Sequence, residues 1–194
     1  REVLERIAHA FIEKLWLPDA GYPAMLREYF PPHQLHRSAW LYNCFLPVDC
    51  ELVDKFEAVT CLDYSRWGLE NVREPLGGRT VWLSNWVPAI WSVRRNEAGE
   101  NFQLAYAYFK AGFGDEGFEL LSGALRRAGF GAGSPGHICS EAASLLARAV
   151  ICGMHGYRPD YPNGKVLLAP AYPPDWRQAS IMLPYVNCTY KQTE

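Results

Sequence analysis

The sequence lacks a strong charge of either sign: 19 Lys and Arg residues stand against 21 Asp and Glu, a net charge of −2 over 194 residues. So small an imbalance argues against nucleic acids and anionic membrane surfaces as partners. No apolar run approaches the roughly 20 residues that cross a bilayer, and the N-terminus has no signal-peptide pattern. Because the chain opens at Arg1 inside a helical pattern, without an initiator methionine, we expect a fragment or a processed form.

The sequence also lacks the spacings of metal and cofactor sites. None of the six cysteines forms a C-x-x-C pair, so buried free thiols are favoured over a zinc or thioredoxin-type site, with a disulfide left open. His33, His36 and His137 have no spacing that indicates metal ligands. The glycine-rich residues 129–137 carry no Gly-Lys-Ser/Thr, and Ser134 does not stand in G-x-S-x-G. We therefore expect no metal and no cofactor, and a serine hydrolase is disfavoured.

The centre of the chain predicts a buried helix and an amphipathic helix in one hairpin. Residues 101–111 are apolar on nearly every side, which is typical of a helix that is buried all round. Gly112-Phe113-Gly114 interrupts the pattern, and residues 115–127 resume it with apolar side chains on one face only. An inner helix, a glycine turn and an outer helix make an αα-hairpin.

Further helical patterns flank this hairpin. Apolar residues recur at helical spacing in three more segments, and we expect helices there: residues 3–16, 48–67 and 140–153. Asp49 is a candidate N-cap of the second helix, and Gly153 is a candidate C-cap of the third. Loops are expected at residues 33–40 and 67–78.

The character of the sequence changes at Tyr157. Prolines then punctuate short apolar segments, of which residues 165–169 and 179–183 are expected to be strands. Asn163-Gly164 suits a tight turn before the first strand. The sequence therefore predicts a mainly α fold of antiparallel αα-hairpins over residues 1–156, followed by the start of a short β-rich C-terminal segment over residues 157–194.

Four stretches follow one another in the order LSNWVPAIWSVR, ENFQLAYAYFKAGFGDEGFELLSG, GSPGH and ARAVICGMHGYRPDYPNGKVLLAPAYPPDWRQASIMLPY. Together they resemble the C-terminal half of bacterial six-hairpin glycosidases, the (α/α)6-barrel enzymes related to α-L-rhamnosidases. The resemblance runs from about Arg1 to Tyr190. It implies that the hairpins form part of an (α/α)6 toroid, and that an N-terminal portion of the same enzyme is missing. It also implies a periplasmic or extracellular location, with the cytoplasm as the alternative.

Glycoside hydrolysis uses two carboxyl groups, about 6.5–9.5 Å apart for inversion and about 5–5.5 Å apart for retention. The resemblance directs the search to acids in loops at the ends of inner helices. Glu70 lies beside Trp67, and an aromatic neighbour would raise the pKa of a general acid. The alternative for Glu70 is a surface salt bridge with Arg66 or Arg73. Glu141 opens the last inner helix, where the resemblance implies a general base. Its alternative is a first-turn glutamate that interacts favourably with the helix dipole.

Two further acids and several aromatic residues complete the predicted site. Asp49 and Glu28 are additional candidate acids, and N-capping is the alternative for Asp49. Tryptophans in residues 81–93, Trp82 among them, are candidates to stack on a sugar ring, with core packing as the alternative. The predicted substrate-binding residues are Trp86, Trp91, Asn85, Arg94, Trp40 and His137.

Three classes of function follow from these residues. The first is a glycoside hydrolase, or a piece of one, that cleaves a polysaccharide or oligosaccharide by two-carboxylate acid–base chemistry. The second is a non-catalytic helical module that binds carbohydrate or protein. The third is an isomerase or epimerase on a similar α-barrel, for which His137 is the candidate residue. We also expect the chain to behave poorly alone, because half a toroid would leave an apolar flank of residues 101–111 open.

Overall fold

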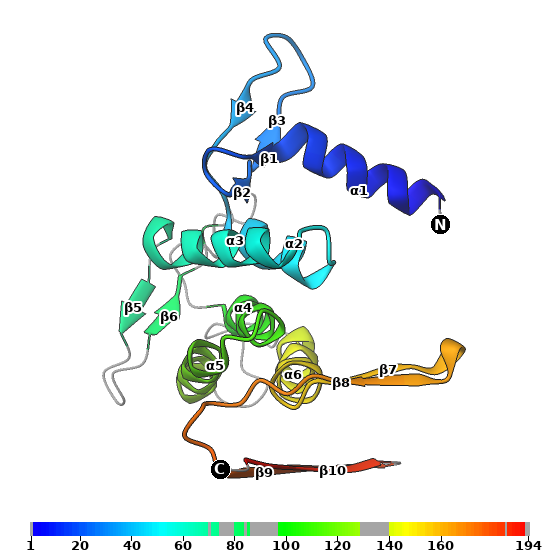
Figure 1. Ribbon diagram of the computed structural model, residues 1–194. Coiled ribbons are helices and arrows are strands. Elements are labelled where there is room, and N and C mark those ends of the chain that lie inside the picture. Colours follow the sequence, from blue (N-terminus) through cyan, green and yellow to red (C-terminus); the bar gives the residue numbers. More distant parts are fainter. Residues whose placement is uncertain are drawn as a thin grey trace.

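The computed structural model describes residues 2–69, 71–73, 80–83, 85, 97–128, 140–184 and 186–192. It is mainly α-helical with a β-rich C-terminal segment, as the sequence predicts (Figure 1). The helices are α1 (Glu2–Leu15), α2 (Leu41–Asp49), α3 (Lys55–Gly68), α4 (Ala98–Lys110), α5 (Gly114–Ala128) and α6 (Ser140–Arg148), and a π-helical segment, η2 (Ala149–Met154), continues α6. No described helix is long and apolar enough to cross a membrane.

The described strands form five antiparallel pairs of two strands each. The pairs are β1 (Trp16–Leu17) with β2 (Tyr22–Pro23), β3 (Leu26–Arg27) with β4 (Leu35–His36), β5 (Asn71–Arg73) with β6 (Thr80–Trp82), β7 (Tyr157–Asp160) with β8 (Lys165–Leu168), and β9 (Gln178–Leu183) with β10 (Val186–Lys191). In Figure 1, α1 and the β3–β4 hairpin lie at one extreme of the molecule, and the β9–β10 ribbon lies at the other.

Helix α4 is the centre of the core. Every residue from Ala98 to Phe109 is buried apart from half-buried Gly99, and α2, α5, α6 and η2 all pack on this helix. The predicted buried helix is therefore confirmed. Because neighbours surround α4, the apolar flank that we expected to be open is closed. The open apolar stripe lies instead on α1, where Val3, Leu4 and Ile7 are 64, 70 and 60% exposed.

The hairpin between α4 and amphipathic α5 is also confirmed. Gly112 has a φ of +90°, a conformation that side chains with a Cβ rarely adopt. The backbone N–H of Phe113 donates to the carbonyl of Tyr108 at 2.9 Å, which closes the end of α4. Glycine at this position lets the chain reverse within a few residues.

The predicted single helix over residues 48–67 is wrong, because two helices meet there. Helix α2 ends at Asp49, and α3 begins after Asp54. The carboxylate of Asp54 accepts hydrogen bonds from the N–H groups of Phe56 and Glu57 at 2.8 and 2.9 Å, and the Glu57 carboxylate accepts from Asp54 N–H at 2.9 Å. This reciprocal capping box starts the helix at Lys55, so Asp49 is not an N-cap.

Three smaller expectations are corrected as well. Residues 33–40 contain β4 and residues 67–78 contain β5, strands too short to leave a periodic pattern. Gly153 lies inside η2 and is not a C-cap. A Cβ at Gly153 would lie 3.0 Å from the Phe109 ring and 3.1 Å from the Tyr106 ring, so this glycine permits close packing on α4. The predicted strands at 165–169 and 179–183 are confirmed as β8 and β9, with Gly164 in the turn before β8 at φ +61°.

Candidate functional site

The first turns of α4 and α6 meet the start of α2 at Tyr42. The charges of Glu97 and Glu100, from the beginning of α4, and of Glu141, from the first turn of α6, all act on the Tyr42 phenol. Glu100 also forms a side-chain hydrogen bond with Tyr42. Carboxylates from two separate helices therefore gather at one end of the helical layer.

This environment raises the pKa of the Tyr42 phenol. Burial, then the negative charges of Glu100 and Glu141, raise the pKa of Tyr42 to about 12. The phenol consequently stays protonated at physiological pH and can donate a hydrogen bond to a carboxylate.

Two asparagines fix the chain where it enters α2. The amide oxygen of Asn85 accepts a hydrogen bond from the N–H of Leu41 at 2.8 Å, and its amide nitrogen donates to the carbonyl of Ala39 at 2.9 Å. Asn43 completes the start of the helix by accepting from the N–H of Trp40 at 3.0 Å. Asn85, predicted to bind sugar hydroxyls, thus supports the backbone at the same end of the layer as Tyr42.

Trp40 precedes α2 and lies beside this group. Its ring is half-buried, and its Nε1–H is buried without a hydrogen-bond partner among the residues that the structure describes. A buried indole N–H normally has a partner. Trp40, predicted from the sequence as a sugar-binding residue, therefore has a buried donor close to the start of α2 that no described residue pairs.

The structure describes only part of the predicted site. Glu141 is exposed in the first turn of α6, and its carbonyl accepts a hydrogen bond from Ser144 Oγ at 2.8 Å. Glu70, Trp86, Trp91, Arg94 and His137 lie outside the described residues, so their predicted roles and positions stay predictions. Trp82 is a core residue, because its N–H and its carbonyl both bond the buried Asn101 side chain.

Sequence reasoning missed Glu97 and Glu100. We expected acids within loops, whereas Glu97 precedes α4 and Glu100 is buried in its first turn, 6% exposed. The signal was the sequence Asn-Glu-Ala-Gly-Glu-Asn, which places two acids where a tryptophan-rich segment meets a wholly apolar helix. Charged residues are rarely buried without a specific partner, so acids at such a position are candidates for a functional role.

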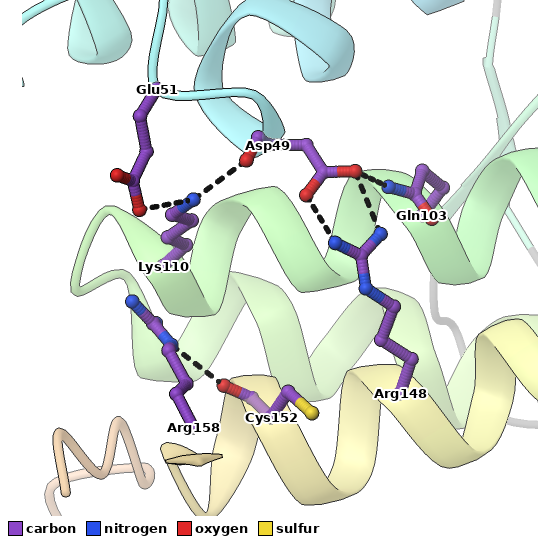
Figure 2. Close-up of polar contacts among 7 residues, drawn as sticks. All are labelled: Asp49, Glu51, Gln103, Lys110, Arg148, Cys152 and Arg158. Atoms are coloured by element: carbon purple, nitrogen blue, oxygen red, sulfur yellow. Dashed lines mark hydrogen bonds and ion pairs between the residues drawn. The ribbon is translucent and has the colours of Figure 1, made fainter. Parts of the chain in front are cut away.

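Asp49 belongs to a different group at the far end of α2 (Figure 2). Its carboxylate receives two hydrogen bonds from the Arg148 guanidinium, at 2.5 and 2.7 Å, and a third from Gln103 Nε2 at 2.5 Å. Lys110 Nζ donates to the Asp49 carbonyl at 2.7 Å and pairs with Glu51 at 2.9 Å. A carboxylate so fully engaged ties α2, α4 and α6 together, and it is not available as the catalytic acid considered from the sequence.

Glu28 is also engaged elsewhere. Its Oε1 lies 3.0 Å from His36 Nε2, across the β3–β4 hairpin. This hydrogen bond lowers the pKa of Glu28. A carboxyl group that is held ionised suits a general base better than a general acid.

The described residues contain no cluster of His, Cys, Asp and Glu that would hold a metal ion. Their five cysteines are free thiols. The burial favoured from the sequence holds for Cys44 and Cys61, whereas Cys50 is exposed and Cys152 and Cys188 are half-buried. No protein-family model matches the chain, and no curated protein is significantly similar to it.

Proposed function

We propose that this chain carries acid–base residues of a glycoside hydrolase at the end of the helical layer where α2, α4 and α6 begin. The observation that supports this most is the gathering of Glu97, Glu100 and Glu141 around Tyr42. Carboxyl groups on separate, rigid helices can face each other across a bound sugar, which is the arrangement that glycoside hydrolysis requires.

The two best candidates differ in their access to water, and this suggests their roles. Glu100 is the candidate to donate a proton to the leaving oxygen, because it is buried and burial disfavours the charged form of a carboxyl group. Exposed Glu141 can reach and activate a water molecule. Glu70 stays an alternative partner of Glu141, as proposed from the sequence, and the hairpins are proposed to belong to an (α/α)6 toroid.

The aromatic residues of this end fit a carbohydrate substrate. Trp40 is half-buried and its indole N–H has no partner among the described residues, and Asn85 holds the start of the tryptophan-rich stretch against the N-terminus of α2. An indole ring offers an apolar face and a polar edge, which matches the two kinds of surface on a pyranose.

Hydrolysis of a panel of aryl glycosides and oligosaccharides by the natural protein tests the proposal. Glu100→Gln and Glu141→Gln should each lower kcat by roughly 10²–10⁴-fold, with the melting temperature and the circular dichroism spectrum preserved. Glu119→Gln, on the exposed face of α5, is the matched control and should keep full activity. Glu70→Gln, measured in parallel, decides between the two candidate acids.

A leaving-group comparison identifies the general acid. Glu100→Gln should lose far less activity on dinitrophenyl glycosides than on oligosaccharides, because dinitrophenolate departs without protonation. Equal losses on both substrates would remove Glu100 from this role, and full activity in both the Glu100 and the Glu141 variants would contradict the proposed site. Binding of oligosaccharides with no hydrolysis of any substrate would favour the non-catalytic module.

A further inference from the structure

A groove of about 730 Å³ opens at the opposite end of the layer from Tyr42. It lies between the segment that joins α2 to α3, the C-terminal end of α4 and the residues that follow β8. Its walls are mainly apolar, and the side chains that form them include Val48, Val53, Val59, Phe109, Ala111 and Pro170. Phe56 stands at its edge and is 84% exposed. This volume is typical of sites that bind small molecules.

Most charged groups of the groove already have partners. Lys110 Nζ bonds the Asp49 carbonyl and the Glu51 carboxylate, and this contact with Lys110 lowers the pKa of Glu51. The Asp54 carboxylate caps α3 by accepting hydrogen bonds from two backbone N–H groups. The side chains of Lys110, Glu51 and Asp54 therefore already have partners within the protein.

Lys55 and Arg158, which also line the groove, are the exceptions. Of these two cations, Arg158 is the one whose side chain is held by a hydrogen bond to the protein. Its Nε donates to the carbonyl of Cys152 at 3.1 Å, and this is its only hydrogen bond to the part of the chain that the structure describes. Figure 2 shows the guanidinium reaching from β7 toward the C-terminal end of α4, below Lys110. The Cys152 carbonyl fixes the orientation of the guanidinium, whose charge also acts on Glu51. The two Nη groups of Arg158 form no hydrogen bond to the described residues and can bind a ligand.

We propose that this groove is a binding site for a small amphipathic carboxylate. The ligand's carboxylate pairs with Arg158, whose planar fork matches a carboxylate with two parallel hydrogen bonds. Its apolar body packs against Val59, Phe109 and Phe56. A sugar fits this groove poorly, because the apolar walls leave its hydroxyl groups without hydrogen-bond partners. The site is separate from the acids around Tyr42 and does not depend on the proposed hydrolase activity.

Binding of 4-phenylbutanoate and of its neutral analogue 4-phenylbutanamide, measured by calorimetry on the natural protein, tests the proposal. The carboxylate should bind roughly tenfold more tightly than the amide, because a hydrogen bond to a charged group is stronger than one to a neutral group. Arg158→Gln should abolish this preference while leaving the affinity for the amide unchanged. Arg126→Gln, an exposed arginine of α5, is the matched control.

Phe56→Ala separates the apolar half of the site from the ionic half. Because Phe56 is exposed, its truncation should preserve folding and weaken both ligands by a similar factor. Equal binding of acid and amide, or an unchanged preference in Arg158→Gln, would overturn the proposal. So would the absence of binding by either probe, or a dimer that Phe56→Ala converts to monomers, since the groove would then be covered by protein.

Discussion

The two ends of α2 differ in the charged groups that surround them. At the start of α2, Tyr42 sits among the negative charges of Glu97, Glu100 and Glu141. At its last residue, seven positions and about 10 Å along the helix axis, Asp49 is neutralised by two hydrogen bonds from Arg148. The same helices, α4 and α6, supply acids at one end and basic or amide partners at the other.

Helix dipoles explain part of this difference. The N-terminal turns of α4 and α6 carry partial positive charge, which stabilises the glutamates there. Asp49 lies at the negative end of α2, where a carboxylate is disfavoured and needs a cation beside it. The dipole accounts for acids in first turns, but it does not account for three of them acting on one half-buried phenol. This convergence is why the start of α2 is the proposed catalytic end, whereas the hydrogen bonds of Asp49 hold the helices together.

Removing Asp49 should have the largest effect on stability. Asp49→Ala leaves Arg148 and Gln103 without their shared acceptor, and the Asp49 side chain is only 10% exposed. We expect a loss of roughly 2–4 kcal/mol in the free energy of unfolding, below the full buried-pair range because Arg148 is partly solvated. Urea denaturation measures it. Asp175→Ala, at an exposed turn, is the control, and equal stability of the two variants would remove the structural role of Asp49.

Arg148→Lys should cost less. The lysine retains the charge but cannot form two parallel hydrogen bonds to Asp49, and it lacks the planar group that lies 4.3 Å from the centre of the Tyr106 ring. We expect a loss of about 1–2 kcal/mol in the same denaturation experiment. A lysine variant as stable as the natural protein would show that only charge matters at this end.

Asp54→Ala should cost about 1 kcal/mol, because it removes the cap of α3 and leaves two backbone N–H groups to water. Asp54→Asn keeps an acceptor and should recover most of the loss. Thermal unfolding of the three proteins measures both steps. An unchanged melting temperature in Asp54→Ala would mean that packing on the neighbouring elements, and not the cap, holds α3.

The contact between His155 and Tyr172 should have the smallest effect, and one that depends on pH. Burial lowers the pKa of His155 below 6.5, and the Tyr172 hydroxyl lies 2.6 Å from its Nδ1. The folded state therefore binds this proton less readily than the unfolded chain, so the stabilisation is complete above about pH 6.5 and is lost as the pH falls below it. His155→Gln should reduce the difference in melting temperature between pH 8 and pH 5.5. His9→Gln, on exposed α1, should leave that difference unchanged.

The sequence predicts the elements whose cause is local and misses contacts between distant residues. An apolar pattern on all sides was sufficient to predict the buried helix α4, and Gly112 the turn after it. The capping box at Asp54 was readable in Asp-Lys-Phe-Glu but was overlooked in favour of Asp49. The pairing of Asp49 with Arg148, 99 residues later, has no local signal, because α4 must first bring α2 and α6 together. Glu100 was missed for a related reason: its proximity to Tyr42 is a property of the packed helices.

The pKa of Tyr42 tests most directly whether the carboxylates of α4 and α6 meet at one place. Titration of ¹³C-labelled tyrosine, followed by NMR and assigned with Tyr42→Phe, should give a pKa of about 12. Both Glu100→Gln and Glu141→Gln should lower that pKa, because each removes a negative charge that disfavours the phenolate, while Glu119→Gln should not change it. A Tyr42 pKa near the usual 10, or one that is insensitive to Glu141→Gln, would contradict the convergence on which the proposed site rests.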